Sequence, residues 1–140
     1  MKPEFQADRD NFHIPSNAGE LADSLVAVMM RIPDGWGRWI ACERGWYSII
    51  IEIDRRLAEL DPNYVVYQIK QKCGDLCFYF DPTELASDGI REMMNEIVIE
   101  GEKRAATTCE ECGFTGVGVN KGTGFRVQTL CEACRLSGWG

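Results

Sequence analysis

Residues 109–134 read CEECGFTGVGVNKGTGFRVQTLCEAC and hold two Cys-x2-Cys pairs, Cys109 with Cys112 and Cys131 with Cys134. Zn2+ prefers a tetrahedron of thiolate sulfurs, and each Cys-x2-Cys turn presents two sulfurs to one ion. Four cysteine ligands leave no open coordination position, so we expect one Zn2+ that holds the fold together and takes no part in catalysis. Two disulfides, or four cysteines buried as apolar side chains, are the alternatives.

The insert between the two pairs predicts a β-hairpin that carries them back to each other. Residues 114–119 and 125–130 are the predicted strands, and the Gly-rich residues 120–124 are the predicted turn. Gly113 suits the left-handed backbone position that such a Cys-x2-Cys turn tends to need. A helix leads almost directly into Cys109, so we expect a zinc ribbon of residues 109–140 docked on a body of residues 1–108.

The composition is that of an ordinary globular chain. Its 140 residues suffice for one domain with a core, and 45% hydrophobic with 26% charged residues is typical of soluble proteins. No apolar run approaches the roughly 20 residues of a membrane span, and the first ten residues contain no apolar segment of a secretory signal. Seven cysteines in such a chain favour reduced thiols and metal over disulfides, so we expect a cytoplasmic protein with no membrane partner.

The net charge of −7 is unevenly distributed along the chain. Residues 1–100 contain 10 basic against 18 acidic residues, whereas residues 101–140 contain 5 against 4. Proteins that bind duplex nucleic acid usually have a basic stripe, because neutralisation of phosphates supplies most of their affinity. The absence of such a stripe argues against a large duplex-binding surface and leaves a local nucleic-acid contact open.

The rest of the chain predicts an α+β body with about three helices and a β-hairpin, so that the whole is an α+β fold with a C-terminal four-cysteine zinc ribbon. Residues 1–18 show little periodicity and are expected to be irregular. The predicted elements are a helix at 19–31 capped by Ser16 or Asn17, a helix at 45–60, strands at 64–71 and 76–80 around a turn at 73–75, and a helix that begins at the N-cap Asp81 and reaches Ala105, with 87–89 as a point where it can break or restart.

Three segments together resemble a family of small phage and prophage proteins. They are Gly45-Trp46-Tyr47 at the start of a helix, VVYQIKQKCGDLCFYF at residues 65–80, and TTCEECG at residues 107–113. The family carries a Gly-Trp-Tyr helix, a QVKEKFGGLRFY-like hairpin and a trailing zinc ribbon, and the resemblance covers roughly residues 36–134. It departs from the family where Cys73 replaces an aromatic residue and Cys77 replaces Arg. The resemblance implies a phage or mobile-element context, a host-cell cytoplasm and a zinc ribbon, but no activity.

Four more residues of metal-ligand type lie outside the two Cys-x2-Cys pairs. They invite a second site with three cysteine ligands and one histidine. Cys73 and Cys77 flank the predicted hairpin turn, but nothing in the spacing brings the other two near them. Free cysteines more often behave as small apolar residues, which is the alternative. The candidate ligands of this second metal site are His13, Cys42, Cys73 and Cys77.

Catalytic patterns are weak, so the sequence favours a protein that is not an enzyme and leaves the question open. A Cys–His or Ser–His pair would need His13, the only histidine, to be held firmly by a segment that looks irregular. Asp61 followed by Gln68 and Lys70 weakly resembles the metal-dependent nuclease pattern, in which carboxylates hold Mg2+ and a lysine steadies the attacking water. The alternative is that Gln68 and Lys70 form the solvated face of an antiparallel strand.

The leading functional hypothesis is a non-enzymatic accessory protein that binds another protein and, in a phage setting, inhibits a host component. Trp36, Trp39 and Trp46 lie within eleven residues and predict either an aromatic binding surface or an aromatic core. A second hypothesis is nucleic-acid binding through the ribbon. Its candidate contacts are Lys121, Phe125, Arg126 and Arg135. The metal-dependent nuclease is the third.

Overall fold

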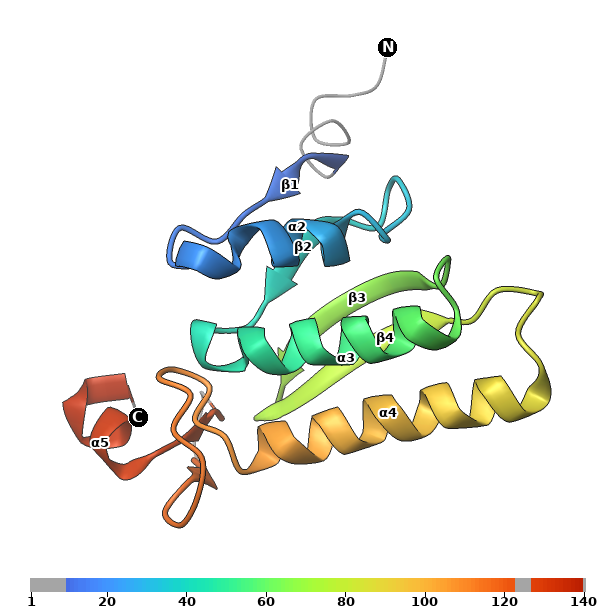
Figure 1. Ribbon diagram of the computed structural model, residues 1–140. Helices are drawn as coiled ribbons and strands as arrows, with labels where there is room; N and C mark the ends of the chain where they lie inside the picture. Colours follow the sequence, from blue (N-terminus) through green and yellow to red (C-terminus); the bar gives the residue numbers. More distant parts are fainter. Residues whose placement is uncertain (1–9, 123–126, 140) are drawn as a thin grey trace.

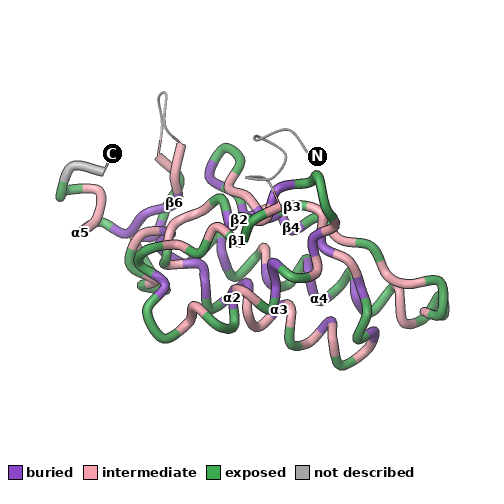
Figure 2. Tube along the Cα trace, turned by 90° about the horizontal axis from the view of Figure 1, so that it is seen from above, coloured by how far each residue is buried: buried purple, intermediate pink, exposed green. Residues whose placement is uncertain are grey.

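Helices cover one face of a four-stranded mixed sheet, and the Cys-rich segment lies at one end of this body (Figure 1). The computed structural model describes residues 10–122 and 127–139. A turned view shows the helices on one side and the strands on the other (Figure 2), which confirms the predicted α+β fold. The strands, in spatial order, are β1 (Phe12–His13), β2 (Arg38–Ala41), β3 (Val65–Lys72) and β4 (Asp75–Asp81), and the helices over them are α2 (Ala22–Met29), α3 (Tyr47–Leu60) and α4 (Asp88–Ala106).

β3 and β4 form the antiparallel hairpin that the sequence predicts, and its turn is the dipeptide Cys73-Gly74. Lys72 pairs with Asp75, so only two residues connect the strands. Both turn residues have positive φ, 53° for Cys73 and 85° for Gly74, as a type I′ turn requires. This turn therefore helps to set the register of the hairpin.

β1 and β2 enlarge the hairpin into the four-stranded sheet, and the sequence analysis predicts neither of them. β2 runs parallel to β3 with Ile40 beside Ile69, and β1 runs parallel to β2. The expectation that residues 1–18 are irregular is therefore wrong for residues 12–13. Strands of two and four residues are too short for an alternating pattern to stand out. β2 forms because the edge of β3 offers unpaired backbone groups, and β1 pairs in turn with the edge of β2.

Apolar side chains of the two layers meet in one core. On the sheet, Ile40, Ile69 and Phe78 are buried at alternate positions of their strands, so their neighbours face the other way. α3 and α4 approach closely because Gly101 has no side chain, and a Cβ there would overlap Ile53. The helices contribute Leu25, Val28, Met29, Ile49, Ile50, Leu57, Met94, Ile97 and Val98 to the core.

Helix α4 begins later than the sequence analysis predicts. Asp81 is the last residue of β4 and accepts a hydrogen bond from the Tyr67 hydroxyl, so it does not cap a helix. Ser87 is the N-cap instead, and its Oγ accepts a hydrogen bond from the Ile90 N–H (3.2 Å). The prediction of Asp81 as N-cap is wrong, because Asp81 extends the pairing of β4 with β3.

Helix α2 also begins in a different way from the prediction. A 3-10 turn, η1 (Gly19–Leu21), precedes it, and neither turn nor helix has a side-chain cap. Asn17 does not cap a helix, since its Oδ1 accepts a hydrogen bond from the Tyr47 hydroxyl (3.1 Å). Capping by Ser16 or Asn17 is therefore wrong. No helix within the described residues is both long and apolar enough to cross a membrane.

The Cys-rich segment contains less strand than predicted. β5 (Asn120–Lys121) pairs antiparallel with β6 (Thr129–Leu130), followed by α5 (Glu132–Cys134) and a π-helical turn, η3 (Arg135–Trp139). The predicted strand at 114–119 is wrong: only Thr115 makes a bridge there, and Gly116 and Gly118 have positive φ. Of the predicted strand at 125–130, residues 125 and 126 lie outside the described residues.

Candidate metal centre

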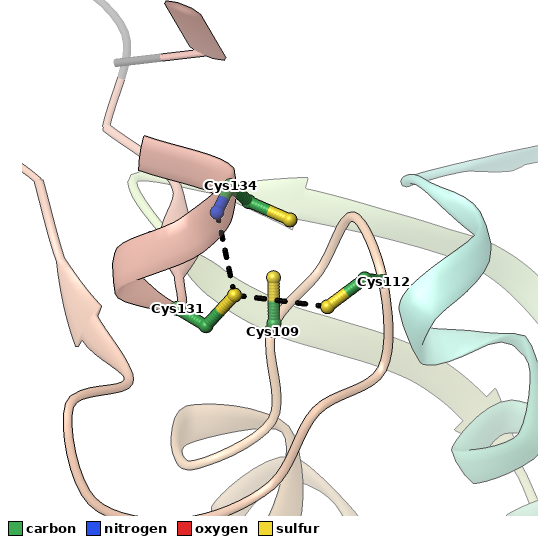
Figure 3. Close-up of side chains that lie close together, drawn as sticks. All are labelled: Cys109, Cys112, Cys131 and Cys134. Atoms are coloured by element: carbon green, nitrogen blue, oxygen red, sulfur yellow. Dashed lines mark hydrogen bonds between the residues drawn. The ribbon is translucent and has the colours of Figure 1, made fainter. Parts of the chain in front are cut away.

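The thiol sulfurs of the two Cys-x2-Cys pairs converge on one point. All four Sγ atoms lie within 4.8 Å of one another, although they come from segments on either side of β5 and β6 (Figure 3). Cys109 and Cys112 occupy the loop that follows α4, whereas Cys131 precedes α5 and Cys134 ends it. The hairpin of β5 and β6 brings the second Cys-x2-Cys pair back to the first, as the sequence predicts for a hairpin between them.

Each pair is shaped by its own backbone. In the first pair, Gly113 has φ of 85° and its N–H donates to the Cys109 carbonyl oxygen (2.9 Å), which closes the turn. The N–H of Phe114 then points to Cys112 Sγ at 3.5 Å. In the second pair, Cys131 is the N-cap of α5, and the Cys134 N–H points to its Sγ at 3.5 Å. Backbone N–H groups directed at sulfur favour the thiolate form that a metal ion requires.

The spacing of the sulfurs fits a tetrahedral metal ion. Metal–sulfur bonds of about 2.3 Å place the sulfurs of a tetrahedron about 3.8 Å apart, and Cys112 Sγ lies 3.7 Å from Cys131 Sγ. All seven cysteines have free thiols, so the structure does not support the disulfide alternative. The four residues could therefore hold a metal ion as a closed set of ligands.

The protonation of these thiols depends on one another. Burial raises the pKa of the Cys109 thiol, but N–H groups of Cys112, Cys131 and Glu111 outweigh it and bring the pKa down to about 7. Burial raises the pKa of the Cys134 thiol, and its neighbouring thiols raise it further. Four adjacent sulfurs cannot all become thiolates unless a cation balances their charge. A metal ion at the centre is therefore the condition under which all four could ionise.

The first Cys-x2-Cys loop is attached to the start of α3. Residues 43–46, which include the 3-10 turn η2 (Arg44–Trp46), donate hydrogen bonds to residues 108–111. Gly45 is required at the centre of this contact, because a Cβ there would overlap the carbonyl oxygens of Cys109 and Glu110. The hydrogen bonds run from Glu43 N to Glu110 Oε2 (3.0 Å), from Arg44 Nε to Glu111 O (3.1 Å), from Gly45 N to Glu110 O (2.6 Å) and from Trp46 Nε1 to Thr108 O (2.8 Å).

A second contact joins β6 to the β3–β4 turn. The Thr129 hydroxyl donates to the Gly74 carbonyl oxygen (2.7 Å), and Gln71 Nε2 donates to the Val127 carbonyl oxygen (3.1 Å). Lys121 on β5 forms an ion pair with Asp75 (2.7 Å). The metal centre thus lies between two contacts with the body, one at the start of α3 and one at the hairpin turn.

Glu110 and Gly45 are site residues that the sequence patterns do not identify. The Glu110 side chain is only 2% exposed, and its two oxygens accept hydrogen bonds from the Glu43 N–H and from Gln128 Nε2. Burial raises the pKa of its carboxyl above the usual value, although these hydrogen bonds act in the opposite direction. A Glu between two cysteines looks solvent-exposed in sequence. Gly45 had a signal, since it opens the Gly-Trp-Tyr segment, but nothing in the sequence points to Cys109 as its neighbour.

The candidates for a second metal site do not come together. Within the described residues, the four-cysteine cluster is the one group of metal-ligand side chains close enough to hold an ion. Cys73 is exposed in the hairpin turn, Cys77 lies on β4, and Cys42 packs against the core. His13 lies on β1, with its ring edge-on to Trp39 at 5.3 Å.

The residues of the nuclease pattern have other neighbours. Asp61 is buried, and its two oxygens accept hydrogen bonds from the N–H (2.7 Å) and the hydroxyl (2.8 Å) of Thr83. Gln68 and Lys70 lie on β3 at positions that alternate with the buried Ile69, as the alternative interpretation predicts. Asp61 therefore holds the segment after β4, and the geometry gives the nuclease pattern no support.

The three tryptophans divide between core and surface. Trp46 is fully buried, whereas Trp36 and Trp39 are 57% and 40% exposed. Trp39 belongs to the exposed sheet face, which we define as the outward residues of the sheet on the side away from the helices. They are His13, Trp39, Ala41, Gln68, Lys70, Lys72, Asp75, Cys77 and Tyr79.

Two of the proposed ribbon contacts for nucleic acid have structural roles. Lys121 pairs with Asp75, and Arg135 Nη2 donates to the carbonyl oxygens of Asn120 (2.7 Å) and Leu130 (3.1 Å). Phe125 and Arg126 lie outside the described residues.

Comparisons with protein-family models, curated proteins and solved structures find no match. The resemblance to small phage proteins therefore stays a prediction.

Proposed function

We propose that the protein is a non-enzymatic binding module that one structural Zn2+ stabilises and that uses its exposed sheet face to contact a partner. The ion is supported by the donor set, because a closed tetrahedron of four thiol sulfurs suits Zn2+ and not the hard cations Mg2+ or Ca2+. Bound there, it would join residues 109–112 to residues 131–134. The observation that carries the binding role is the exposure of two aromatic residues, Trp39 (40%) and Tyr79 (44%), on the outward side of the sheet.

Metal content tests the first half of this proposal. We expect about one zinc per chain in purified protein by plasma mass spectrometry, and close to none in Cys112→Ser. Cys77→Ser is the matched control, because Cys77 lies on β4 outside the four-cysteine cluster, and it should keep the ion. Protein free of metal when prepared in zinc-replete medium would refute a structural ion.

A binding role is favoured over catalysis by the way candidate catalytic residues are used. Asp61 is engaged with Thr83, and Lys70 lies near the Tyr79 ring with its Nζ 5.8 Å from the ring centroid. In a phage or mobile-element setting, such a module would act by occupying a host component or a phage partner. The sequence predicts a protein as that partner.

Site-specific photocrosslinking tests where the partner binds. Benzoylphenylalanine at position 79, on the exposed sheet face, is compared with the same residue at position 93, an exposed position on α4. In cells that produce the protein, we expect crosslinked species from position 79 and far fewer from position 93. Equal yields from the two positions, or none from position 79, would remove the sheet face as the surface that binds a protein partner.

A further inference from the structure

The exposed sheet face has a row of four residues across its four strands, and three of them are aromatic. His13 on β1 pairs with Trp39 on β2, and their rings meet edge-on at 5.3 Å. The register of Ile40 with Ile69 sets Trp39 beside Gln68, and Gln68 pairs with Tyr79 on β4. The row therefore reads His13, Trp39, Gln68, Tyr79. Trp39 and Tyr79 are 40% and 44% exposed, with one strand between them.

A second aromatic pair lies at the irregular part of β3. The register with β4 shifts between Val66 and Gln68, so Tyr67 is an extra residue opposite Phe80 and Tyr79. Its ring packs against Trp36, with the ring centroids 4.9 Å apart. The Tyr67 hydroxyl donates to Asp81 and orients the ring. Two sets of rings thus lie along β3.

The charges beside these rings are basic, in contrast to those of the helices. Lys70 and Lys72 alternate with buried or inward residues of β3, and within the described residues neither forms an ion pair with a carboxylate. Asp75, at the same end of the face, is neutralised by Lys121. Helices α3 and α4 on the other side of the sheet carry eight acidic against five basic residues. An anion that approaches the exposed sheet face therefore meets two lysines, whereas α3 and α4 carry an excess of acidic residues.

Aromatic rings on a sheet, beside lysines that have no carboxylate partner within the described residues, are the chemistry that binds single-stranded nucleic acid. Bases stack on exposed aromatic side chains, and phosphates follow the cationic groups. Gln68, between the two exposed rings, offers an amide donor and acceptor to a base edge. A protein interface would have an apolar centre depleted of charge, whereas Lys70 lies on β3, one of the two inner strands, beside the row. A duplex would need a broader basic surface than two or three lysines supply.

We propose that the exposed sheet face binds single-stranded nucleic acid, with bases stacked on Trp39 and Tyr79 and phosphates along Lys70 and Lys72. This inference rests on the proposed function, because it names the class of partner for the same face. Trp36 with Tyr67 provides a further stacking position toward the other end of β3. The ribbon contributes Lys121 indirectly, since its ion pair masks the charge of Asp75.

Fluorescence anisotropy with labelled 12-nucleotide dT and rU strands, on the full chain with zinc, tests this proposal. We expect binding at low ionic strength that weakens with salt, and weaker binding to a duplex of the same length. Tyr79→Ala should raise the Kd by about 5- to 150-fold, the range for loss of one stacked base. Lys70→Gln should lower the slope of log Kd against log salt by roughly one phosphate contact.

Matched controls separate the face from the rest of the molecule. Phe114→Ala removes an exposed ring outside the sheet, and Lys103→Gln removes a lysine of α4, so both should bind as the wild type does. Because Trp39→Ala can disturb packing, Trp39→Phe is measured as well and should retain most of the binding. The proposal is overturned if neither oligonucleotide binds at low salt, if the duplex binds as tightly as the single strands, or if Tyr79→Ala leaves the Kd unchanged.

Crosslinking and oligonucleotide binding together identify the class of partner that the exposed sheet face takes. Crosslinks to a protein from position 79, together with no oligonucleotide binding, would overturn the nucleic-acid partner and leave the exposed sheet face as a protein-binding surface. No crosslink from position 79 and no oligonucleotide binding would remove the binding function of the face altogether.

Discussion

The backbone of Gly45 lies so close to the carbonyl oxygen of Cys109 that a Cβ on residue 45 would overlap it. Gly45, just before α3, is therefore in direct contact with the candidate metal ligand Cys109, although 63 residues lie between them in sequence. The Gly45 N–H donates to the Glu110 carbonyl oxygen (2.6 Å), and the Trp46 indole donates to Thr108 (2.8 Å). Order at the metal centre and order at the start of α3 are therefore coupled.

Gly45→Ala should destabilise the protein by about 1–3 kcal/mol, because backbone atoms on both sides of the contact cannot move aside easily. Urea unfolding followed by circular dichroism measures the change. Gly89→Ala is the control: residue 89 lies in the first turn of α4, and a Cβ there would meet nothing closer than 4.0 Å. It should be neutral or stabilising. A Gly45→Ala variant as stable as Gly89→Ala would contradict the coupling.

If the four cysteines hold the proposed Zn2+, its removal by a chelator should lower the unfolding temperature and loosen more than residues 109–140. Metal binding and folding are linked in small metal sites, because the unfolded segment lacks a preformed site. We expect amide exchange to rise in residues 109–134 and also near Trp46, whose indole donates to Thr108. Cys112→Ser should reproduce the effect and Cys77→Ser should not. Exchange that rises in residues 109–134 alone would show that the contact with α3 does not depend on the ion.

Asp61→Ala should cost about 1–3 kcal/mol of stability, because it leaves two donors of Thr83 without their buried acceptor. Lys70→Ala, on the exposed sheet face, should change stability by no more than about 0.5 kcal/mol. Denaturant unfolding of both variants measures the difference. If Asp61 were a metal ligand of a nuclease, its loss would instead abolish Mg2+-dependent digestion with stability unaltered.

Glu102 should make stability depend on pH between pH 4 and neutrality. Burial raises the pKa of its carboxyl, the hydrogen bond from the Phe78 N–H lowers it, and Asp75 raises it further. An acid with a raised pKa favours folding at a pH below its unfolded pKa of about 4.3, and this contribution is lost as pH rises through the folded pKa. Glu102→Gln keeps an acceptor for Phe78, so its stability relative to the wild type should increase from pH 4 to pH 7.

Urea unfolding of wild type and Glu102→Gln at several pH values between 4 and 7 checks this sign. Glu59→Gln, an exposed change on α3 away from β4, is the control for altered net charge. A difference between wild type and Glu102→Gln that stays constant with pH would be evidence against a raised pKa.

Parts of the fold that follow local rules can be predicted from the sequence. The stripe of α3, the alternation of β3 and β4, and the Cys-x2-Cys spacing are all short-range patterns, and each has a counterpart in the structure. Errors arose where two local rules competed. Asp81-Pro82 resembles a helix start, but Asp81 pairs with Val65 and is the last residue of β4. Ser87 is therefore the N-cap of α4.

Other features depended on partners far away in sequence. β2 forms because it pairs with β3, and the sequence of a four-residue strand is too short to predict it from its own pattern. The burial of the tryptophans also depends on the tertiary structure. The sequence does not distinguish Trp36, Trp39 and Trp46, but only Trp46 is buried in the core. Burial is a property of where the helices and sheet meet, so residue type alone could not sort them.

The sequence by itself determined the α+β class, the hairpin of β3 and β4, and the four cysteines that could share a metal ion, because periodicity, turn residues and ligand spacing act over a few residues. Only the tertiary structure decided that Gly45 touches Cys109, that Glu110 is buried, and that Trp39 and Tyr79 share one exposed face. The physical reason is that strand register and packing bring together residues that no local pattern connects.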